Sequence, residues 1–278
     1  MRIKNLLMIS LVLLAYMFNT AEAFNSNAAN ISVKLGERLT FESKVLKESR
    51  ELLIHLPAEY NQSEDKFPVI YLLDGGSHFQ HAVTAASILV QNKKMPASII
   101  VGITNNTRKR SRDAYSERNN FIQFLENEVT SLITSKYRVS EFKTLFGHSA
   151  MGFVALELFA NKKNIFDYSI VASPAIDHTD ENLMQKIKSV LGDKVENGQA
   201  LFFSATDKKG ELEGLTDGVK NLDELLKVSA PKEFKWEYLF IPQQTHMTTP
   251  YLTMYQGLNK TYDNFPKLSE TCMLGLCF

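Results

Sequence analysis

A serine suited to nucleophilic chemistry stands in the run Thr144-Leu145-Phe146-Gly147-His148-Ser149-Ala150-Met151-Gly152. A short apolar stretch precedes this serine, and an amphipathic segment, Phe153 to Leu158, follows it. That order is the layout of a nucleophile elbow, in which a glycine two positions before the serine leaves room for a strained turn that lifts the hydroxyl off the sheet edge. Met151 occupies the second glycine position of Gly-x-Ser-x-Gly, so the match is imperfect. Short motifs recur by chance, and the meaning of this one depends on its partners in the chain.

The histidine that such a serine requires is best supplied by His246. A serine hydroxyl is a weak nucleophile unless a histidine removes its proton and a third group orients the imidazole. In hydrolases with this elbow the acid follows the serine and the histidine comes last, each in a loop after a strand. Of the six histidines, His246 is the last and follows a predicted strand, which favours a general base over an ordinary loop histidine. His148 is expected to pack under the turn, because neighbours around a tight elbow point in different directions.

The acid is predicted in the loop after the apolar strand Leu201 to Ala205. Asp207 is the preferred candidate, because it follows that strand most directly. Glu211 and Glu213 share the loop, and each of the three carboxylates also fits a solvated surface charge. The acid of the predicted Ser-His-Asp triad is therefore Asp207, with the two glutamates as alternatives.

Stabilisation of an oxyanion usually takes two backbone N–H groups. One is predicted to be that of Ala150, directly after the nucleophile. The other is predicted in the turn Asp74-Gly75-Gly76-Ser77, which follows a buried strand, and Gly76 is the residue of choice. The alternative for Gly76 is a simple glycine turn.

Four further residues are candidates to line a substrate pocket. His78 comes directly after the oxyanion turn. Arg110 and Arg112, together with Asp113, follow a central strand and fit either a structural ion pair or contact with an acidic substrate group, of which we favour the ion pair. Met151 would either narrow an acyl pocket or alter the packing under the elbow.

The elements that must position these residues are read from apolar runs and their periods. Nearly continuous apolar runs at 68–73 and 98–103 are typical of strands buried on both faces. Strands that alternate with helices predict right-handed βαβ units. The expected fold is therefore a mostly parallel, doubly wound sheet of about eight strands with helices on both faces. The first two strands are expected to form an antiparallel edge. The predicted strands are 31–43, 51–56, 68–73, 98–103, 144–146, 168–172, 201–205 and 236–241, and the predicted helices are 78–91, 121–137, 181–191, 215–228 and 250–263.

The N-terminus, residues 1–23, is predicted to be a secretory signal peptide. Arg2 and Lys4 precede an apolar run from Leu6 to Met17, and Ala21-Glu22-Ala23 is a small-x-small cleavage pattern. The apolar run is short for a membrane span, and no later stretch is long enough to cross a bilayer. We therefore expect an exported protein, periplasmic or secreted, in which residues 24–278 form a single domain.

Net charge, cysteines and metal-ligand spacing limit the partners and cofactors that the sequence predicts. A formal net charge of +0 gives no reason to expect nucleic acid or an anionic membrane surface as a partner. Cys272 and Cys277 lie in the C-terminal tail, where an oxidising compartment would permit them to pair. No group of histidines and carboxylates has convincing metal spacing, so neither a metal nor a cofactor is expected. The sequence does not indicate an oligomeric state.

In this order and spacing, the motifs resemble the putative esterase family of α/β hydrolases over most of residues 24–278. The family includes esterases of trilactone siderophores, feruloyl and other carbohydrate-linked esterases, S-formylglutathione hydrolase and mycolyl transferases. The resemblance implies an α/β-hydrolase fold with Ser149 as nucleophile, His246 as base, and Gly76 and Ala150 as oxyanion donors. It is carried by Tyr71-Leu72-Leu73-Asp74-Gly75 with His78-Phe79, Val101-Gly102-Ile103 with Arg110-Ser111-Arg112-Asp113, Tyr137-Arg138, Gly147-His148-Ser149, Ser173-Pro174 and Thr245-His246.

The leading hypothesis is an exported serine esterase that hydrolyses a carboxylic ester through an acyl-enzyme. An acyltransferase, in which an alcohol replaces water, uses the same triad and differs in how well the pocket excludes water. A hydrolase-shaped binding protein without turnover is the third hypothesis, motivated by Met151 and the acid. The expected partner is a small-molecule or saccharide-linked ester, and an iron-chelating lactone, an acylated sugar and a feruloyl ester all fit the sequence.

Overall fold

The computed structural model describes residues 32–106, 109–177 and 181–265. The chain divides into two units, Met1–Lys34 and Leu35–Phe278, and every element described below belongs to the second. The predicted signal peptide, residues 1–23, and the two tail cysteines lie outside the described residues.

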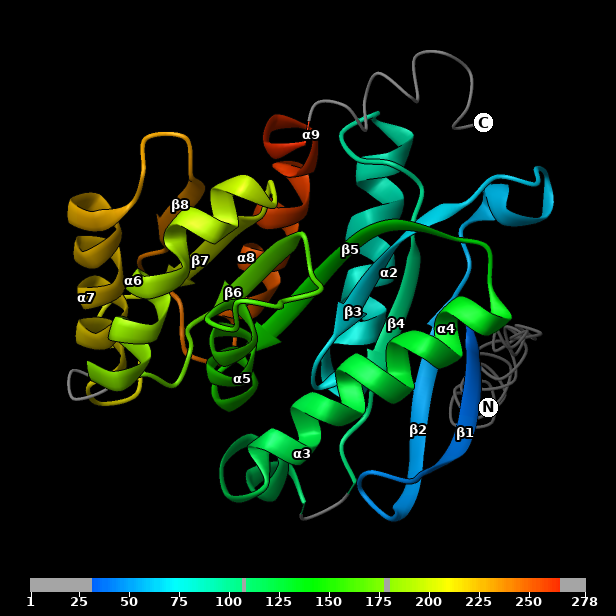
Figure 1. Cartoon of the computed structure of the whole chain (residues 1–278). Coiled ribbons are helices and arrows are strands. Elements are labelled where there is room, and N and C mark those ends of the chain that lie inside the picture. The colour runs from blue at the N-terminus through cyan, green and yellow to red at the C-terminus, as the bar shows by residue number, and fades with distance from the viewer. Residues whose placement is uncertain (1–31, 107–108, 178–180, 266–278) are drawn as a thin grey trace, which may run out of the picture. The chain divides into compact units, whose positions relative to one another are not determined.

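One sheet of eight strands organises the unit that begins at Leu35 (Figure 1). The strand order is β1-β2-β4-β3-β5-β6-β7-β8. The pairs β1–β2 and β2–β4 are antiparallel, and all later pairs along this order are parallel. The predicted α/β-hydrolase fold, with its mostly parallel sheet and antiparallel edge, is confirmed. The strands are β1 (Glu37–Ser43), β2 (Glu48–His55), β3 (Phe67–Leu72), β4 (Ile99–Ile103), β5 (Val139–His148), β6 (Tyr168–Ala172), β7 (Ala200–Ala205) and β8 (Lys235–Phe240).

Side chains of the central strands are buried on both faces of the sheet. In β3, Val69 and Tyr71 belong to one apolar cluster, whereas Ile70 and Leu72 belong to the other. This alternation follows from the two-residue period of a strand. Because both faces are covered, these strands have almost no polar positions, which is why they read as continuous apolar runs.

Helices cover both faces of the sheet, as Figure 1 shows. The apolar cluster on one face takes side chains from α2 and α8, and the cluster on the other takes them from α5, α6, α7 and the segment α3–η3–α4. No helix within the described ranges combines the length and apolar character that a membrane crossing requires. The helical elements are η1 (Ala58–Asn61), α2 (Gly75–Gln91), η2 (Arg112–Ser116), α3 (Arg118–Gln123), η3 (Phe124–Val129), α4 (Thr130–Lys136), α5 (Ala150–Phe159), α6 (Glu181–Glu196), α7 (Leu215–Ser229), α8 (Thr249–Asn259) and α9 (Thr261–Asn264).

Several elements differ from the prediction in extent; for example, β2 begins at Glu48 rather than 51, and α6 ends at Glu196 rather than 191. The predicted helix 121–137 is a helical segment with a π-helical stretch, η3, between α3 and α4. The predicted helix 250–263 divides into α8 and α9 at Lys260. Strand β5 begins at Val139 rather than 144, because its polar first half pairs with β3 without any apolar run to reveal it.

Candidate active site

The predicted site residues follow the carboxyl ends of parallel strands in one half of the sheet. Ser149 follows β5, Asp207 follows β7, and His246 lies in the loop after β8. Carboxyl ends of parallel strands meet at one edge of the sheet, where open α/β sheets bind their ligands. The sheet therefore brings residues far apart in sequence to the same edge.

The nucleophile elbow has the strained geometry that its motif predicts. Ser149 has φ 58° and ψ −126°, a positive φ that costs a residue with a side chain about 1–3 kcal/mol. Its N–H donates to the Ala172 carbonyl over 3.1 Å, and its own carbonyl accepts from Phe153 and Ala175 over 2.9 Å each. These bonds fix the serine between the end of β6 and the start of α5.

Close backbone packing explains where the glycines of the elbow lie. A Cβ on Gly147 would lie 2.4 Å from the Met151 carbonyl oxygen, so no larger residue fits there. A Cβ on Gly152 would come within 3.0 Å of the Pro174 Cα, so the second close approach occurs one residue later than in Gly-x-Ser-x-Gly. The Met151 side chain is fully buried in the core. Of its two proposed roles, the structure supports packing under the elbow and gives it no exposed surface on a pocket.

His246 is hydrogen-bonded through Nδ1 to the Glu211 carboxylate. Both side chains are buried, and the His246 N–H donates to the Gly210 carbonyl over 2.7 Å. Gly210 cannot be larger, because a Cβ there would lie 1.8 Å from the Gln244 carbonyl oxygen. The loops after β7 and β8 are thus locked together around the acid and the imidazole.

Asp207, the preferred acid, does not hold the histidine. Its carboxylate accepts the N–H groups of Lys209, Gly210 and Gln243, over 3.1, 3.2 and 2.8 Å. Those bonds, that of Gln243 first, lower the pKa of Asp207. The preference for Asp207 is corrected, because the structure pairs His246 with Glu211, the alternative in the same loop. An aspartate followed by Lys208-Lys209-Gly210 is typical of a turn, and this pattern indicates that Asp207 binds the backbone of its own loop.

The environment of Glu211 keeps its carboxylate ionised. Burial alone would raise its pKa, but the hydrogen bond to His246, the nearby Ser173 hydroxyl and the Leu212 N–H lower it below its ordinary value. The Leu212 N–H lies 3.0 Å from Oε1. Sequence reasoning did not assign Ser173 a role at the site, although Ser173-Pro174 follows the buried strand β6. Ser173 is fully buried with φ 36°, a second strained residue at this edge.

The two predicted oxyanion donors lie in the first turns of two helices, α2 and α5, that pack on opposite faces of the sheet. Ala150 opens α5 and Gly76 is the second residue of α2, so neither N–H has an acceptor within its own helix. The strands before these helices, β3 and β5, are adjacent and parallel. Both helix N-termini therefore present N–H groups and partial positive charge at the same edge.

Asp74 anchors the turn that carries Gly76, the predicted oxyanion donor. It is buried, has φ 55° and accepts hydrogen bonds from Asn105 and from Arg110, whose Nε and Nη2 lie 2.7–3.1 Å from its two oxygens. The next residue, Gly75, must be a glycine, because a Cβ would lie 2.4 Å from the Gly102 carbonyl carbon. Gly76 has open space around its Cα and is exposed.

Both candidate pocket arginines are in ion pairs. Arg110 pairs with Asp74, and its side chain remains 38 % exposed. Arg112 binds Glu48 over 2.8 Å and Asp113 over 2.6 Å. The geometry supports the structural interpretation for both residues.

His78 and His148 pack beneath the elbow. The His78 ring stands edge-on to Phe146 and to His148, with centroids 5.2 and 5.6 Å apart. His148 Nε2 donates to the His246 carbonyl over 2.9 Å. Burial lowers the pKa of both imidazoles, that of His148 to about 3. His78 is nearly inaccessible, so it supports the site from below rather than lining an open pocket.

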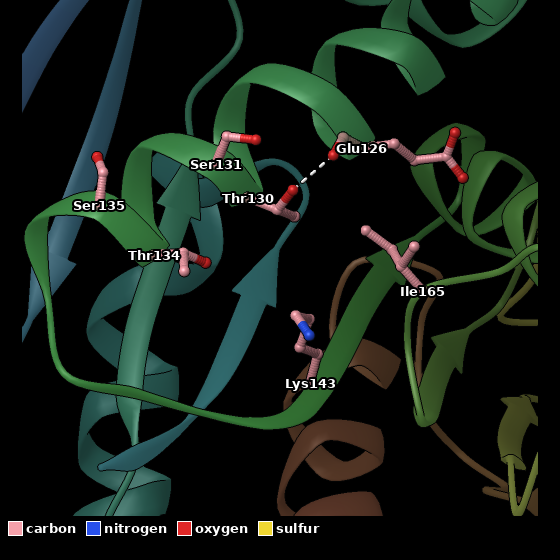
Figure 2. Close-up of a pocket in the computed structure, with 7 residues that line it drawn as sticks. All are labelled: Glu126, Thr130, Ser131, Thr134, Ser135, Lys143 and Ile165. Atoms are coloured by element: carbon pink, nitrogen blue, oxygen red, sulfur yellow. Dashed lines mark hydrogen bonds between the residues drawn. The ribbon is translucent and has the colours of Figure 1, made fainter.

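Metal-ligand groups and surface pockets are the other features that could form a site. In the described part of the chain, no group of three or more histidine, cysteine, aspartate or glutamate side chains is placed to hold a metal ion. A pocket of about 480 Å³ opens beside α4 and β5 (Figure 2). Its Lys143 precedes Ser149 by six residues of extended strand, which places the pocket roughly 20 Å from the elbow. It is lined by Glu126, Thr130, Ser131, Thr134, Ser135, Lys143 and Ile165.

Fold and site together define an α/β hydrolase. The family model described as "Putative esterase" matches residues 43–265, and the chain belongs to that family. The predicted family is confirmed, and with it the predicted class of enzyme, one that hydrolyses esters.

Similar proteins place the chain among esterases. The ferri-bacillibactin esterase BesA of Bacillus subtilis is 24 % identical over 217 residues, covering 66 % of this chain and 74 % of BesA. The uncharacterized protein YjcH of the same organism is 27 % identical over 146 residues, which span 49 % of this chain and 60 % of YjcH. An IroE-like serine hydrolase from Shewanella oneidensis has a TM-score of 0.72 at 25 % identity, with 84 % of this chain and 87 % of that chain covered. The BES protein from Bacillus cereus shares the fold, with a TM-score of 0.74 at 21 % identity over 84 % of this chain and 98 % of that one.

Proposed function

We propose that the protein is an exported serine esterase with the triad Ser149, His246 and Glu211. The observation that carries this proposal is the Glu211–His246 pair, buried at the sheet edge where the strained Ser149 stands. A carboxylate on Nδ1 fixes the imidazole tautomer that leaves Nε2 as the base and stabilises the imidazolium that forms. Glu211 suits that task, because its lowered pKa keeps it charged.

The reaction proceeds through an acyl-enzyme. Ser149 Oγ attacks the ester carbonyl carbon while its proton passes to His246 Nε2. The carbonyl oxygen becomes an oxyanion, which accepts hydrogen bonds from the backbone N–H groups of Gly76 and Ala150. The tetrahedral intermediate collapses, the bond to the alcohol oxygen breaks, and His246 returns the proton to that oxygen. Water then attacks the acyl-enzyme with the same base, which releases the acid and regenerates the serine.

The two charge-stabilising elements differ in how they are held. Ala150 is fixed by the elbow itself, whereas the turn at Gly76 is fixed through Asp74 and Arg110. Loss of one oxyanion donor typically costs about 3 kcal/mol of transition-state stabilisation. The ion pair between Arg110 and Asp74 therefore supports the proposed reaction indirectly, because it holds the turn that carries Gly76.

The proposal is tested by hydrolysis of short-chain p-nitrophenyl esters. We expect Ser149→Ala to lower kcat by about 10⁴-fold or more, because a triad loses nearly all of its catalysis with its nucleophile. Ser87→Ala, at an exposed serine of α2, is the matched control and is expected to keep wild-type kcat. Equal rates for wild type and Ser149→Ala would overturn the proposal.

Two further measurements separate the esterase from its alternatives. A fluorophosphonate probe is expected to label Ser149, because an activated serine reacts readily; absence of labelling would instead favour a binding protein without turnover. Addition of an alcohol or sugar acceptor is expected to leave the free acid as the main product, whereas an acylated acceptor would identify an acyltransferase.

The names of similar proteins support a proposal for the substrate class. Their names include a ferri-bacillibactin esterase, siderophore hydrolases from Aspergillus nidulans, an enterobactin esterase and a ferulic acid esterase. We propose a small-molecule or saccharide-linked carboxylic ester as substrate. A panel of trilactone siderophores, feruloyl esters and acylated sugars tests this, and a preference for simple alkyl esters over all three would contradict it.

Export is proposed from the N-terminal pattern, with residues 24–278 as a single esterase domain. N-terminal sequencing of the protein recovered from a cell that makes it is expected to begin at Phe24. Recovery of Met1 in the cytoplasmic fraction would contradict export and leave the esterase proposal untouched.

A further inference from the structure

His148 connects the strand that carries the nucleophile to the loop that carries the base. It is the last residue of β5, directly before Ser149, and its side chain is 4 % exposed. Its Nε2 lies 2.9 Å from the His246 carbonyl oxygen, and the two rings are 4.6 Å apart between centroids. A carbonyl oxygen only accepts, so Nε2 carries the hydrogen and donates.

That connection spans a wide gap in the sheet. Strands β5 and β8 are separated by β6 and β7, and three strand spacings amount to roughly 14 Å. The loop after β8 must therefore reach back along the sheet edge to bring His246 to Ser149. Its other hydrogen bonds to the rest of the described chain hold it to the end of β7 and the loop that follows, at Ala205, Thr206, Asp207, Gly210 and Glu211. Within the described residues, the bond from His148 is the one recorded between the His246 loop and β5.

The surroundings of His148 keep it a neutral donor. Burial, followed by the charges of His246 and His78, lowers the pKa of His148 to about 3. Phe146 and His148 flank the edge-on ring of His78, which closes the space beneath the elbow. A ring that stays neutral with its hydrogen on Nε2 cannot carry the reaction's proton, but it can hold a carbonyl in place.

We propose that His148 is a positioning residue for the esterase reaction: its Nε2–H bond to the His246 carbonyl sets the distance between the base and the serine. This inference rests on the proposed function. The distance between nucleophile and base matters, because a displacement of about 1 Å can lower a rate about 10²-fold. The residue between the glycine and the serine of the elbow thus takes part in aligning the triad through the backbone of the histidine.

The test compares two substitutions of matched length. His148→Gln keeps an N–H donor, and His148→Met has a similar shape without one. With a p-nitrophenyl ester, we expect His148→Met to lower kcat about 10- to 100-fold with KM within about 3-fold of wild type. We expect His148→Gln to recover most of that loss at a similar melting temperature. A purely structural role would lower the melting temperature of both variants without separating their kcat values.

The outcomes separate this inference from the proposed function. Wild-type kcat in His148→Met, or equal losses in His148→Met and His148→Gln, would overturn the positioning role while Ser149→Ala remains inactive. Activity in Ser149→Ala would overturn the proposed function itself. Nitrogen NMR of the wild-type imidazole supplies a measurement that needs no variant: we expect the Nε2–H tautomer of His148 at pH 7, and an Nδ1–H tautomer or an imidazolium would overturn the inference.

Discussion

Two buried clusters of charged and titratable side chains lie at the same edge of the sheet and are built in opposite ways. The Arg50 cluster consists of Glu48, Arg50, Arg112 and Asp113, and the His246 cluster consists of His148, Glu211 and His246. In the Arg50 cluster, permanent charges of opposite sign face one another. In the His246 cluster, one carboxylate binds one imidazole, and a second imidazole binds the backbone carbonyl of the first histidine.

The Arg50 cluster uses nearly every polar atom it has. The Arg50 and Asp113 side chains are completely buried and 2.8 Å apart, and Arg50 also binds Glu48 over 3.0 Å and the Thr104 carbonyl over 3.1 Å. The Arg50 guanidinium lies 5.0 Å from the centroid of the Phe124 ring. The ion pairs of this cluster join β2 to η2, and its charged groups are already bound to one another.

The His246 cluster keeps one reactive position unused. Nδ1 of His246 is bound to Glu211, its carbonyl to His148 and its N–H to Gly210. These three hydrogen bonds hold His246 in place, and none of them involves Nε2. The comparison teaches that nearly complete pairing of buried charges suits a structural role, whereas a buried histidine whose Nε2 makes none of these hydrogen bonds suits the proposed role of base.

Glu211→Gln is expected to have the largest effect. An amide in place of the carboxylate no longer stabilises the imidazolium and favours the wrong tautomer, so kcat for a p-nitrophenyl ester should fall about 10³- to 10⁴-fold. The matched control is Asp207→Asn, which keeps an acceptor for the loop N–H groups and should change kcat less than about 10-fold. A larger loss in Asp207→Asn than in Glu211→Gln would reverse the assignment of the acid.

Asp113→Ala is the corresponding test of the Arg50 cluster. It leaves Arg50 buried without its main partner and should lower the free energy of unfolding by about 3–5 kcal/mol, measured by urea denaturation. Activity per folded molecule should change little. The exposed Glu117, 3.9 Å from Arg112, supplies the control: Glu117→Ala should cost less than about 1 kcal/mol. Equal losses in the two variants would show that burial does not decide the effect.

Gly210→Ala is expected to disturb the His246 cluster without touching its side chains. The new Cβ meets the Gln244 carbonyl, and a shift of about 1 Å in this loop should lower kcat about 10²-fold. Gly192→Ala, in α6 with open space around it, should instead stabilise the protein by about 0.5–1 kcal/mol and keep wild-type kcat. Unchanged kcat in Gly210→Ala would show that the contact between the two loops does not align the base.

Substitution of Glu48 is expected to have the smallest effect, which is on how the free energy of unfolding depends on pH. Hydrogen bonds from Arg112, Lys109 and Arg50 hold the pKa of Glu48 well below its ordinary value of 4.5, against the opposing effect of burial. Because the folded pKa is depressed, the stabilisation is present above about pH 5 and is lost as the pH falls. Glu48→Gln should therefore show a shallower loss of stability between pH 5 and pH 3, by on the order of 1 kcal/mol after screening by water. Unfolding midpoints across this range measure it, with Glu51→Gln as the surface control; parallel curves for wild type and Glu48→Gln would contradict it.

Most of the fold was predictable, because it depends on local patterns. The strand β6 matches its prediction residue for residue, and the continuous apolar runs of β3 and β4 marked the centre of the sheet. The first half of β5 was missed for the opposite reason: it has no apolar run, and it joins the sheet where Val139 and Lys143 pair with β3, which no local pattern indicates. The π-helical stretch η3 was missed because its residues continue the apolar stripe of a helix.

The candidate site was predictable up to the choice among nearby carboxylates. Ser149 and His246 are marked by motif and chain order, whereas Asp207, Glu211 and Glu213 share one loop and one chemistry. Asp207 binds three backbone N–H groups, and Glu211 reaches the imidazole. Which of them turns inward depends on the path of the loop after β7.

The sequence by itself determined the parallel sheet, the elbow at Ser149 and the histidine after the last strand, because hydrophobic period, glycine placement and chain order are local properties. The tertiary structure decided that Glu211 is the partner of His246, that Met151 is buried, and that His148 reaches the backbone of His246. Each of these depends on contacts between segments that only the folding of the sheet brings together, and side-chain identity does not specify the distance between loops.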